Sequence, residues 1–187
     1  MIRILIGSIL GGLAQWVIGA IAWIFFADGS VVKSLDDGGN ATLQAALAAT
    51  LTPTGTGTYF IPHSPTAQGA IQMGKGPVAM IFFNTNGFPT FDMTSILTGL
   101  VLSIVMLFLV GVALTQVDGI AARIKVTLLF AAATLLYFVL SLPVYNFYMP
   151  WGWWVFLAAE EAVAFGAGAY ILIRWFMPPT PPGPTLH

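Results

Sequence analysis

The chain has 187 residues, of which 58% are hydrophobic and 7% are charged, and its net charge is -1. Globular domains carry roughly 25% charged residues, so this composition excludes a water-facing surface over most of the chain and predicts an integral membrane protein. Its 6 basic residues are scattered, which leaves no patch for nucleic acid. Because there is no cysteine, a disulfide or a thiolate metal site is excluded as well.

A membrane-spanning helix needs about 20 mostly apolar residues. Four segments meet that requirement: residues 4–27, 94–115, 126–142 and 151–176. The first follows Arg3, like the start of a signal peptide, but its apolar run exceeds the roughly 7 to 15 residues of a signal sequence. We therefore expect an uncleaved helix over residues 1–27. The predicted fold class is membrane all-α, a bundle of four transmembrane helices.

Small residues recur every four positions in the first span, at Gly7, Gly11 and Gly19, with Gln15 in the same series. Small residues at this spacing let helices approach closely in lipid. The pattern predicts a helix-packing ridge that faces either the last span or another chain. Gln15 lies in the middle of the span, and because an amide in hydrocarbon needs partners, we expect it to face protein.

Residues 28–92 are richer in Gly, Thr, Pro and Asn, and they predict a small α+β domain outside the membrane. Asn40 is a suitable N-cap for a helix over residues 41–49, which Pro53 must end. Two runs rich in β-branched and aromatic residues, 58–61 and 78–83, predict a pair of antiparallel strands. Ser64 followed by Pro65 predicts a short helix over residues 66–72 between them. A domain this small has a marginal core, so we expect it to bury apolar surface on the membrane helices or on a partner.

Basic residues near the span ends predict the orientation. Arg3 precedes the first span, Arg123 and Lys125 lie in the predicted link between the second and third, and Arg174 closes the fourth. Because Lys and Arg favour the cytoplasmic side, we expect both termini to be cytoplasmic and residues 28–92 to lie outside.

An aromatic cluster separates the third span from the fourth. Its members are Tyr145, Tyr148, Trp151, Trp153 and Trp154. They stand where interfacial anchors are expected, and anchoring is the favoured interpretation. The alternative is an aromatic rim that stacks on a ligand.

The fourth span carries Glu160 and Glu161, about 14 Å inward from Trp151 at about 1.5 Å per residue and so near the depth of Gln15. Ionisable residues at this depth are costly and indicate a possible intramembrane polar site. Two interpretations stay open. One is a proton or cation relay. The other, which we favour, is a protonated carboxyl that hydrogen-bonds to Gln15 or Tyr137 and fixes the helix register.

Small residues in the same span form two further ridges. One joins Glu160 to Ala164 and Gly168, and the other consists of Ala158, Ala162 and Gly166. Both predict that the fourth helix is tightly packed.

Catalytic motifs are missing from the sequence. The two histidines, His63 and His187, lie outside the spans, so no span offers a haem ligand. Neither a nucleophile elbow nor an H-E-x-x-H motif is present. We expect no enzymatic activity, no metal and no cofactor. The proline-rich segment 177–187 is expected to be an extended cytoplasmic tail able to dock on a partner.

Three stretches carry a resemblance: 57–62 (GTYFIP), 76–79 (GPVA) and 142–148 (LPVYNFY). Together with the glycine-rich first span and the acid-bearing last span, they resemble a family of uncharacterised bacterial inner-membrane proteins with a small periplasmic domain. The resemblance covers most of the chain. It implies a bacterial inner membrane and a periplasmic segment 28–92, and it implies no activity and no site residues.

Two functions from different classes fit these observations. The first is a non-enzymatic accessory or structural subunit of a larger or self-assembled inner-membrane complex. Its partners would be membrane lipids and other membrane-protein subunits, or a second copy, burying the glycine ridge. The alternative is a small transporter or lipophilic-ligand binder that uses the acidic pair beneath the aromatic rim. A wet cavity at Glu160 would support this alternative.

Overall fold

The computed structural model describes residues 1–27, 29–63, 65–146 and 149–177, which form two compact units. The first unit combines Met1–Val32, Asp92–Tyr145 and the chain from Trp151 onward. Within the described residues, four helical segments are long and apolar enough to cross a membrane: Ile2–Ala27, Met93–Gln116, Ile120–Tyr145 and Trp151–Phe176. The four predicted spans are thus confirmed as helices of sufficient length and hydropathy.

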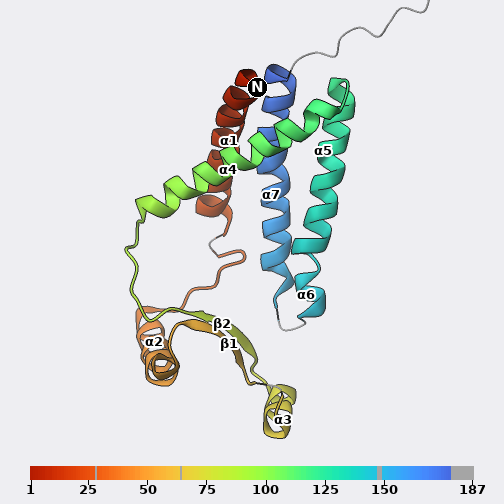
Figure 1. Ribbon diagram of the computed structural model, residues 1–187. Coiled ribbons are helices and arrows are strands. Elements are labelled where there is room, and N and C mark those ends of the chain that lie inside the picture. The colour runs from red at the N-terminus through yellow and green to blue at the C-terminus, as the bar shows by residue number, and fades with distance from the viewer. Residues whose placement is uncertain (28, 64, 147–148, 178–187) are drawn as a thin grey trace, which may run out of the picture. The chain divides into compact units, whose positions relative to one another are not determined.

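Most spans of the first unit end in a turn of altered helical pitch. The first span is α1 (Ile2–Ala22) with the π-helical turn η1 (Trp23–Ala27), and the second is α4 (Met93–Ala113) with the 3-10 turn η3 (Leu114–Gln116). The third span is α5 (Ile120–Thr134), followed by the π-helical turn η4 (Leu135–Val139) and the short helix α6 (Leu142–Tyr145). The fourth is α7 (Trp151–Ile171) with the π-helical turn η5 (Leu172–Phe176). Helices α1, α5 and α7 run alongside one another, and α4 crosses them obliquely (Figure 1).

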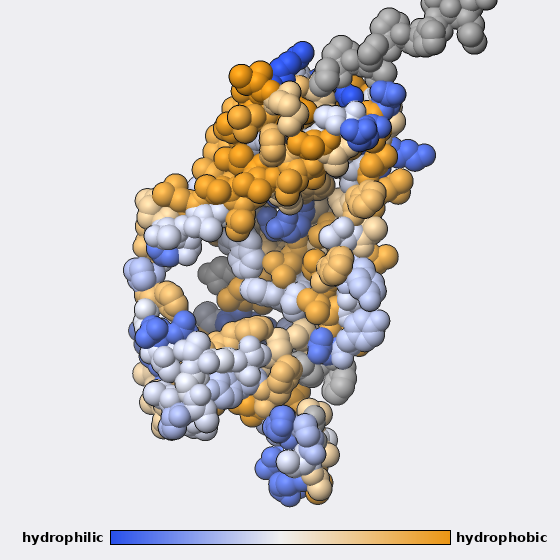
Figure 2. All heavy atoms as spheres, in the orientation of Figure 1, coloured by the Kyte–Doolittle hydropathy of each residue, from blue (hydrophilic) through white to orange (hydrophobic). Residues whose placement is uncertain are grey.

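The core of this unit lies where α1, α4 and η5 meet. Leu107 and Leu172 are fully buried there, and Ile4 and Ile173 are nearly so. The outer faces of the spans remain apolar and exposed, as the hydrophobic surface in Figure 2 shows. Lipid tails are as apolar as leucine, so an exposed apolar face suits a membrane helix.

The third helix begins earlier than the sequence predicts. We expected Arg123 and Lys125 in a link before a span at 126, but α5 already starts at Ile120. Arg123 is 4% exposed, and its Nε donates a hydrogen bond of 2.7 Å to the carbonyl oxygen of Val117. The guanidinium thus satisfies a backbone acceptor just beyond α4, which lets a charged residue enter the first turn of an apolar helix.

The second unit, Lys33–Phe91 with Asn146–Pro150, is a small α+β structure. Its elements are α2 (Asp37–Leu51), the 3-10 turn η2 (Thr52–Thr54), β1 (Gly57–Ile61), α3 (Ala67–Lys75) and β2 (Ala79–Phe83). The strands pair antiparallel, with Tyr59 opposite Ile81, which confirms the predicted pairing. Helix α2 ends just before Pro53, as predicted.

Two predicted helix starts in this unit are wrong. Helix α2 is capped by Asp36, whose side chain accepts a 2.7 Å hydrogen bond from Gly39 N, and the side chain of Asn40 instead donates to the carbonyl oxygen of Leu35. Helix α3 is capped by Thr66, which accepts from Gly69 N. Ser64, our predicted cap, lies outside the described residues.

Candidate functional site

A cavity of about 650 Å³ opens between α1, α4 and α7. Figure 2 shows hydrophilic atoms in a recess of the apolar surface where α7 passes beneath α4. The cavity is lined by Gln15, Trp16, Gly19, Ala20 and Trp23 from the first helical segment, by Ile96, Gly99, Leu102, Ser103 and Met106 from α4, and by Glu160 and Glu161 from α7. The predicted polar residues of two separate spans therefore share one site.

The glycine ridge of α1 packs against the last span and reaches the cavity at Gly19. A Cβ atom added to Gly11 would lie 2.5 Å from the carbonyl oxygen of Gly168, and one added to Gly168 would lie 2.6 Å from that of Gly11. Gly7 faces Phe176, and Gly19 faces Glu160 Oε1. The ridge is therefore covered by the last span of the same chain, the first of the two alternatives that the sequence left open.

The opposite wall comes from the oblique course of α4. A Cβ atom on Gly12 would lie 2.8 Å from the backbone nitrogen of Ile104, so α4 and α1 are in backbone contact at that point. Crossing helices diverge on either side of their closest approach. Toward the start of α4, the space between the two helices is filled only in part by Trp16, and the cavity occupies the rest.

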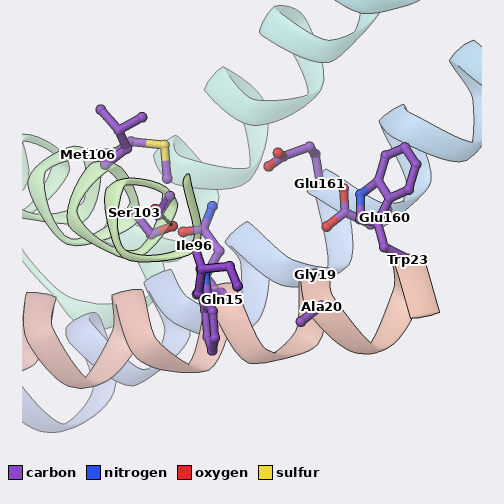
Figure 3. A pocket seen from close by; sticks show the side chains of 12 residues that line it. Gln15, Gly19, Ala20, Trp23, Ile96, Ser103, Met106, Glu160 and Glu161 are labelled. Atoms are coloured by element: carbon purple, nitrogen blue, oxygen red, sulfur yellow. Dashed lines mark hydrogen bonds between the residues drawn. The ribbon is translucent and has the colours of Figure 1, made fainter. Parts of the chain in front are cut away.

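The carboxyl groups of Glu160 and Glu161 are directed into this space, together with the Gln15 amide and the Ser103 hydroxyl (Figure 3). Gln15 is 8% exposed, and its Oε1 is buried without a hydrogen-bond partner in the described part of the chain. Ser103 Oγ donates to the carbonyl oxygen of Gly99.

The register-fixing interpretation required a carboxyl bonded to Gln15 or Tyr137. Gln15 Oε1 has no such partner, and the Tyr137 side chain is 63% exposed with its ring against Phe138. Among the described residues, neither a carboxyl–Gln15 Oε1 bond nor a carboxyl–Tyr137 bond is found at this site.

Only one of the two small-residue ridges of α7 packs as expected. Ala164 and Gly168 are buried against the neighbouring helices. Gly166 has no atom within 4 Å of the position of an added Cβ, and Ala162 is exposed. Of the second ridge, only Ala158 is buried, so that ridge packs at its first residue and not along its length.

The aromatic rim reaches the cavity through a residue that the sequence analysis missed. Trp23 lines the cavity, and its ring meets Trp153 and Phe156 edge-on, at 5.4 Å between ring centroids in each case. Tyr145 and Trp151 are exposed. Trp154 is half-buried, and Tyr148 lies outside the described residues.

A signal for the missing aromatic wall was present in the sequence. Trp16, Ala20 and Trp23 follow one another at helical spacing, on a stripe beside Gln15 and Gly19. That stripe could have indicated which face of the first span adjoins the polar site.

Other predicted features are not part of this site. Among the residues that the structure describes, no three His, Cys, Asp or Glu side chains lie close enough to hold a metal ion. His63 belongs to the second unit. His187 and the rest of the tail from 178 onward lie outside the described residues.

Comparison with protein-family models, with curated proteins and with solved structures found no match. The resemblance to bacterial inner-membrane proteins stays a prediction, and the function has to be argued from the cavity.

Proposed function

We propose that the protein binds a lipophilic small molecule inside the membrane, in the cavity between α1, α4 and α7. The observation that carries this proposal is the cavity itself, about 650 Å³ in volume, in which apolar side chains surround a few polar groups. Ligand sites typically have volumes of about 300 to 1,000 Å³ and pair apolar walls with a small number of polar groups that orient the ligand.

A proton or cation relay receives less support. A relay needs polar groups along the whole path, whereas the next cavity along α7 is lined by Glu161 and Thr134 together with six apolar residues, Met106, Val110, Phe130, Ala131, Leu135 and Phe165.

The accessory-subunit function loses the ridge that motivated it, because α7 covers Gly7, Gly11 and Gly19. That function remains a prediction without a described contact in its favour.

The proposal includes the location and the topology of the protein. We place the chain in a bacterial inner membrane, as a non-enzymatic multi-pass protein with both termini cytoplasmic and residues 28–92 periplasmic. Support comes from the four apolar helices and from the basic residues near their ends.

The test is native mass spectrometry of the protein released gently from its membrane, compared with two matched variants. Gly99→Leu places a side chain in the cavity, where Trp16 Nε1 lies 3.7 Å from the position of the new Cβ. Gly166→Leu adds the same side chain to α7 where there is open space. We expect a bound small molecule on the wild type and on Gly166→Leu, and its loss from Gly99→Leu.

A molecule that stays bound to Gly99→Leu, or a wild-type protein that carries none and takes up none, would refute the proposal. Proton flux in reconstituted vesicles separates the relay from binding. If Glu160→Gln and Glu161→Gln abolish a proton flux of the wild type, the relay replaces the binder.

A further inference from the structure

We infer that the ligand is a single-chain lipid amine, whose head group lies among Gln15, Glu160 and Glu161 and whose chain extends between α4, α5 and α7. This inference rests on the proposed function and names its ligand class. It is carried by the polar groups at one end of the site and by a series of apolar cavities that continues from it.

The ionisable side chains that line the cavity are both acidic. Glu160 and Glu161 supply carboxyl oxygens, and Gln15 Oε1 is a buried acceptor with no partner in the described part of the chain. No basic side chain is among the residues that line the cavity. Glu160 is half-buried and Glu161 is exposed in an apolar span. An ionised carboxylate in apolar surroundings is costly unless a cation or a hydrogen-bond donor accompanies it. A head group that is both cationic and rich in N–H donors matches this set.

The cavity walls favour an organic ammonium over a metal ion. The lining holds two carboxyl groups, and among the described residues no group of three His, Cys, Asp or Glu side chains could hold a metal ion. Trp16 and Trp23 add two indole rings, and aromatic faces attract ammonium groups.

The space for the apolar chain of the ligand adjoins the cavity that would hold its head group. A second cavity of about 310 Å³ shares Met106 and Glu161 with the first. A third, of about 340 Å³, shares Val110, Phe130 and Phe165 with the second. The three cavities follow α4 from Ile96 to Ala113, about 26 Å at about 1.5 Å per residue. Met106 stands at the first boundary, and methionine is flexible enough to let a chain pass.

The experiment measures binding of three ligands of equal chain length to the full-length protein in neutral detergent: octadecylamine, octadecanol and octadecanoic acid. We expect octadecylamine to bind about tenfold more tightly than the other two, because hydrogen bonds to ionised partners are the stronger ones. Glu160→Gln combined with Glu161→Gln should remove the advantage of the amine over the alcohol. Both substitutions keep the size of the side chain, and thermal unfolding checks that the variant is folded.

Chain placement is tested separately with a bulky substitution. Val110 lines the second and third cavities, so Val110→Trp should weaken octadecylamine binding and leave butylamine binding unchanged. Leu109 is 62% exposed and lines none of the three cavities, so Leu109→Trp is the matched control.

The outcomes distinguish the two proposals. If all three ligands bind equally and Gly99→Leu abolishes their binding, the lipophilic site stands and the amine assignment is overturned. If octadecylamine still binds more tightly than octadecanol after both carboxyl groups are replaced, the head group does not lie at Glu160 and Glu161. If none of the three binds and the protein from the native membrane carries nothing, the proposed function itself fails.

Discussion

The carbonyl oxygen of Gly168 occupies the place where a side chain on Gly11 would begin. Replacing Gly11 by alanine must push α1 and α7 apart, since neither backbone can yield locally. We expect Gly11→Ala to destabilise the protein by about 1 to 3 kcal/mol, the usual cost of overpacking. Thermal unfolding in detergent, followed by tryptophan fluorescence, measures the effect.

Gly166 provides the control for this prediction, on the same helix as Gly168. It has open space around the position of an added Cβ. Gly166→Ala should be neutral or should stabilise by up to about 1 kcal/mol, because alanine is the better helix former. If Gly11→Ala and Gly166→Ala lower the melting temperature equally, the close contact of α1 and α7 at Gly11 does not account for the loss of stability.

Asp92 caps α4 just outside the span. Its carboxylate accepts hydrogen bonds from the side chain and backbone nitrogen of Ser95 and from Thr94 N. The side-chain bond from Ser95 is the largest cause that lowers the pKa of Asp92 below its ordinary value, and the backbone bond from Thr94 adds to it. A lowered pKa means that the folded state binds this proton less readily than the unfolded state. The stabilisation is therefore complete above the ordinary pKa and is lost as the pH falls below it.

We accordingly expect Asp92→Ala to lower the melting temperature at neutral pH. The difference from wild type should be constant down to about pH 5 and should shrink below about pH 4, where the unfolded carboxyl becomes protonated. Asp92→Asn keeps an acceptor without the charge and should give a smaller loss that does not vary with pH. A difference that persists undiminished in acid would mean that the cap does not act through its carboxylate.

The polar residues of the site were predictable, and the cavity was not. Gln15, Glu160 and Glu161 are conspicuous because a polar group in an apolar run is rare. Gly99 and Met106 are ordinary residues of an apolar helix. Their place in the wall depends on the oblique crossing of α4, which follows from side-chain packing at Gly12 and has no signature in the sequence of α4 itself.

At the scale of helices and strands, existence could be predicted better than ends. The four spans and the paired strands follow from hydropathy and from β-branched residues. Helix α2 begins where Asp36, and not Asn40, caps it. Helix α5 begins early because the Arg123 side chain hydrogen-bonds to the carbonyl oxygen of Val117. Such contacts depend on a few side-chain torsions, and composition does not encode them.

The second unit has little core of its own. Among its described residues, Leu51 is the only buried apolar side chain, while Phe82 and Phe88 are more than 70% exposed. A chain of this size buries roughly 60% of its surface when it folds alone, and even that leaves it marginal. We expect the isolated segment 33–91 to lack a cooperative thermal transition in circular dichroism. The same segment within the whole chain should show protected amides in hydrogen exchange. A sharp transition of the isolated segment would establish an independent domain and refute this expectation.

At the scale of the whole molecule, the basic residues of the first unit gather at one end. Gly7 packs against Phe176, so the start of α1 with Arg3 lies beside the end of α7 with Arg174. The first turns of α5, with Arg123 and Lys125, are at the same end (Figure 1). If this end is cytoplasmic, the link between α4 and α5 is inside the cell, and the charge rule predicts residues 28–92 outside.

Cysteine labelling tests this orientation, and because the chain has no cysteine, any label on it must lie at the introduced residue. Asn86 and Asp118 are both exposed, the first in the second unit and the second in the link before α5. In intact bacterial cells, a membrane-impermeant maleimide should label Asn86→Cys at once and Asp118→Cys only after permeabilisation. The reverse pattern would invert the protein in the membrane. It would leave the cavity unchanged, since its walls come from α1, α4 and α7 whichever end faces the cytoplasm, but the basic end would then violate the charge rule that predicts the topology.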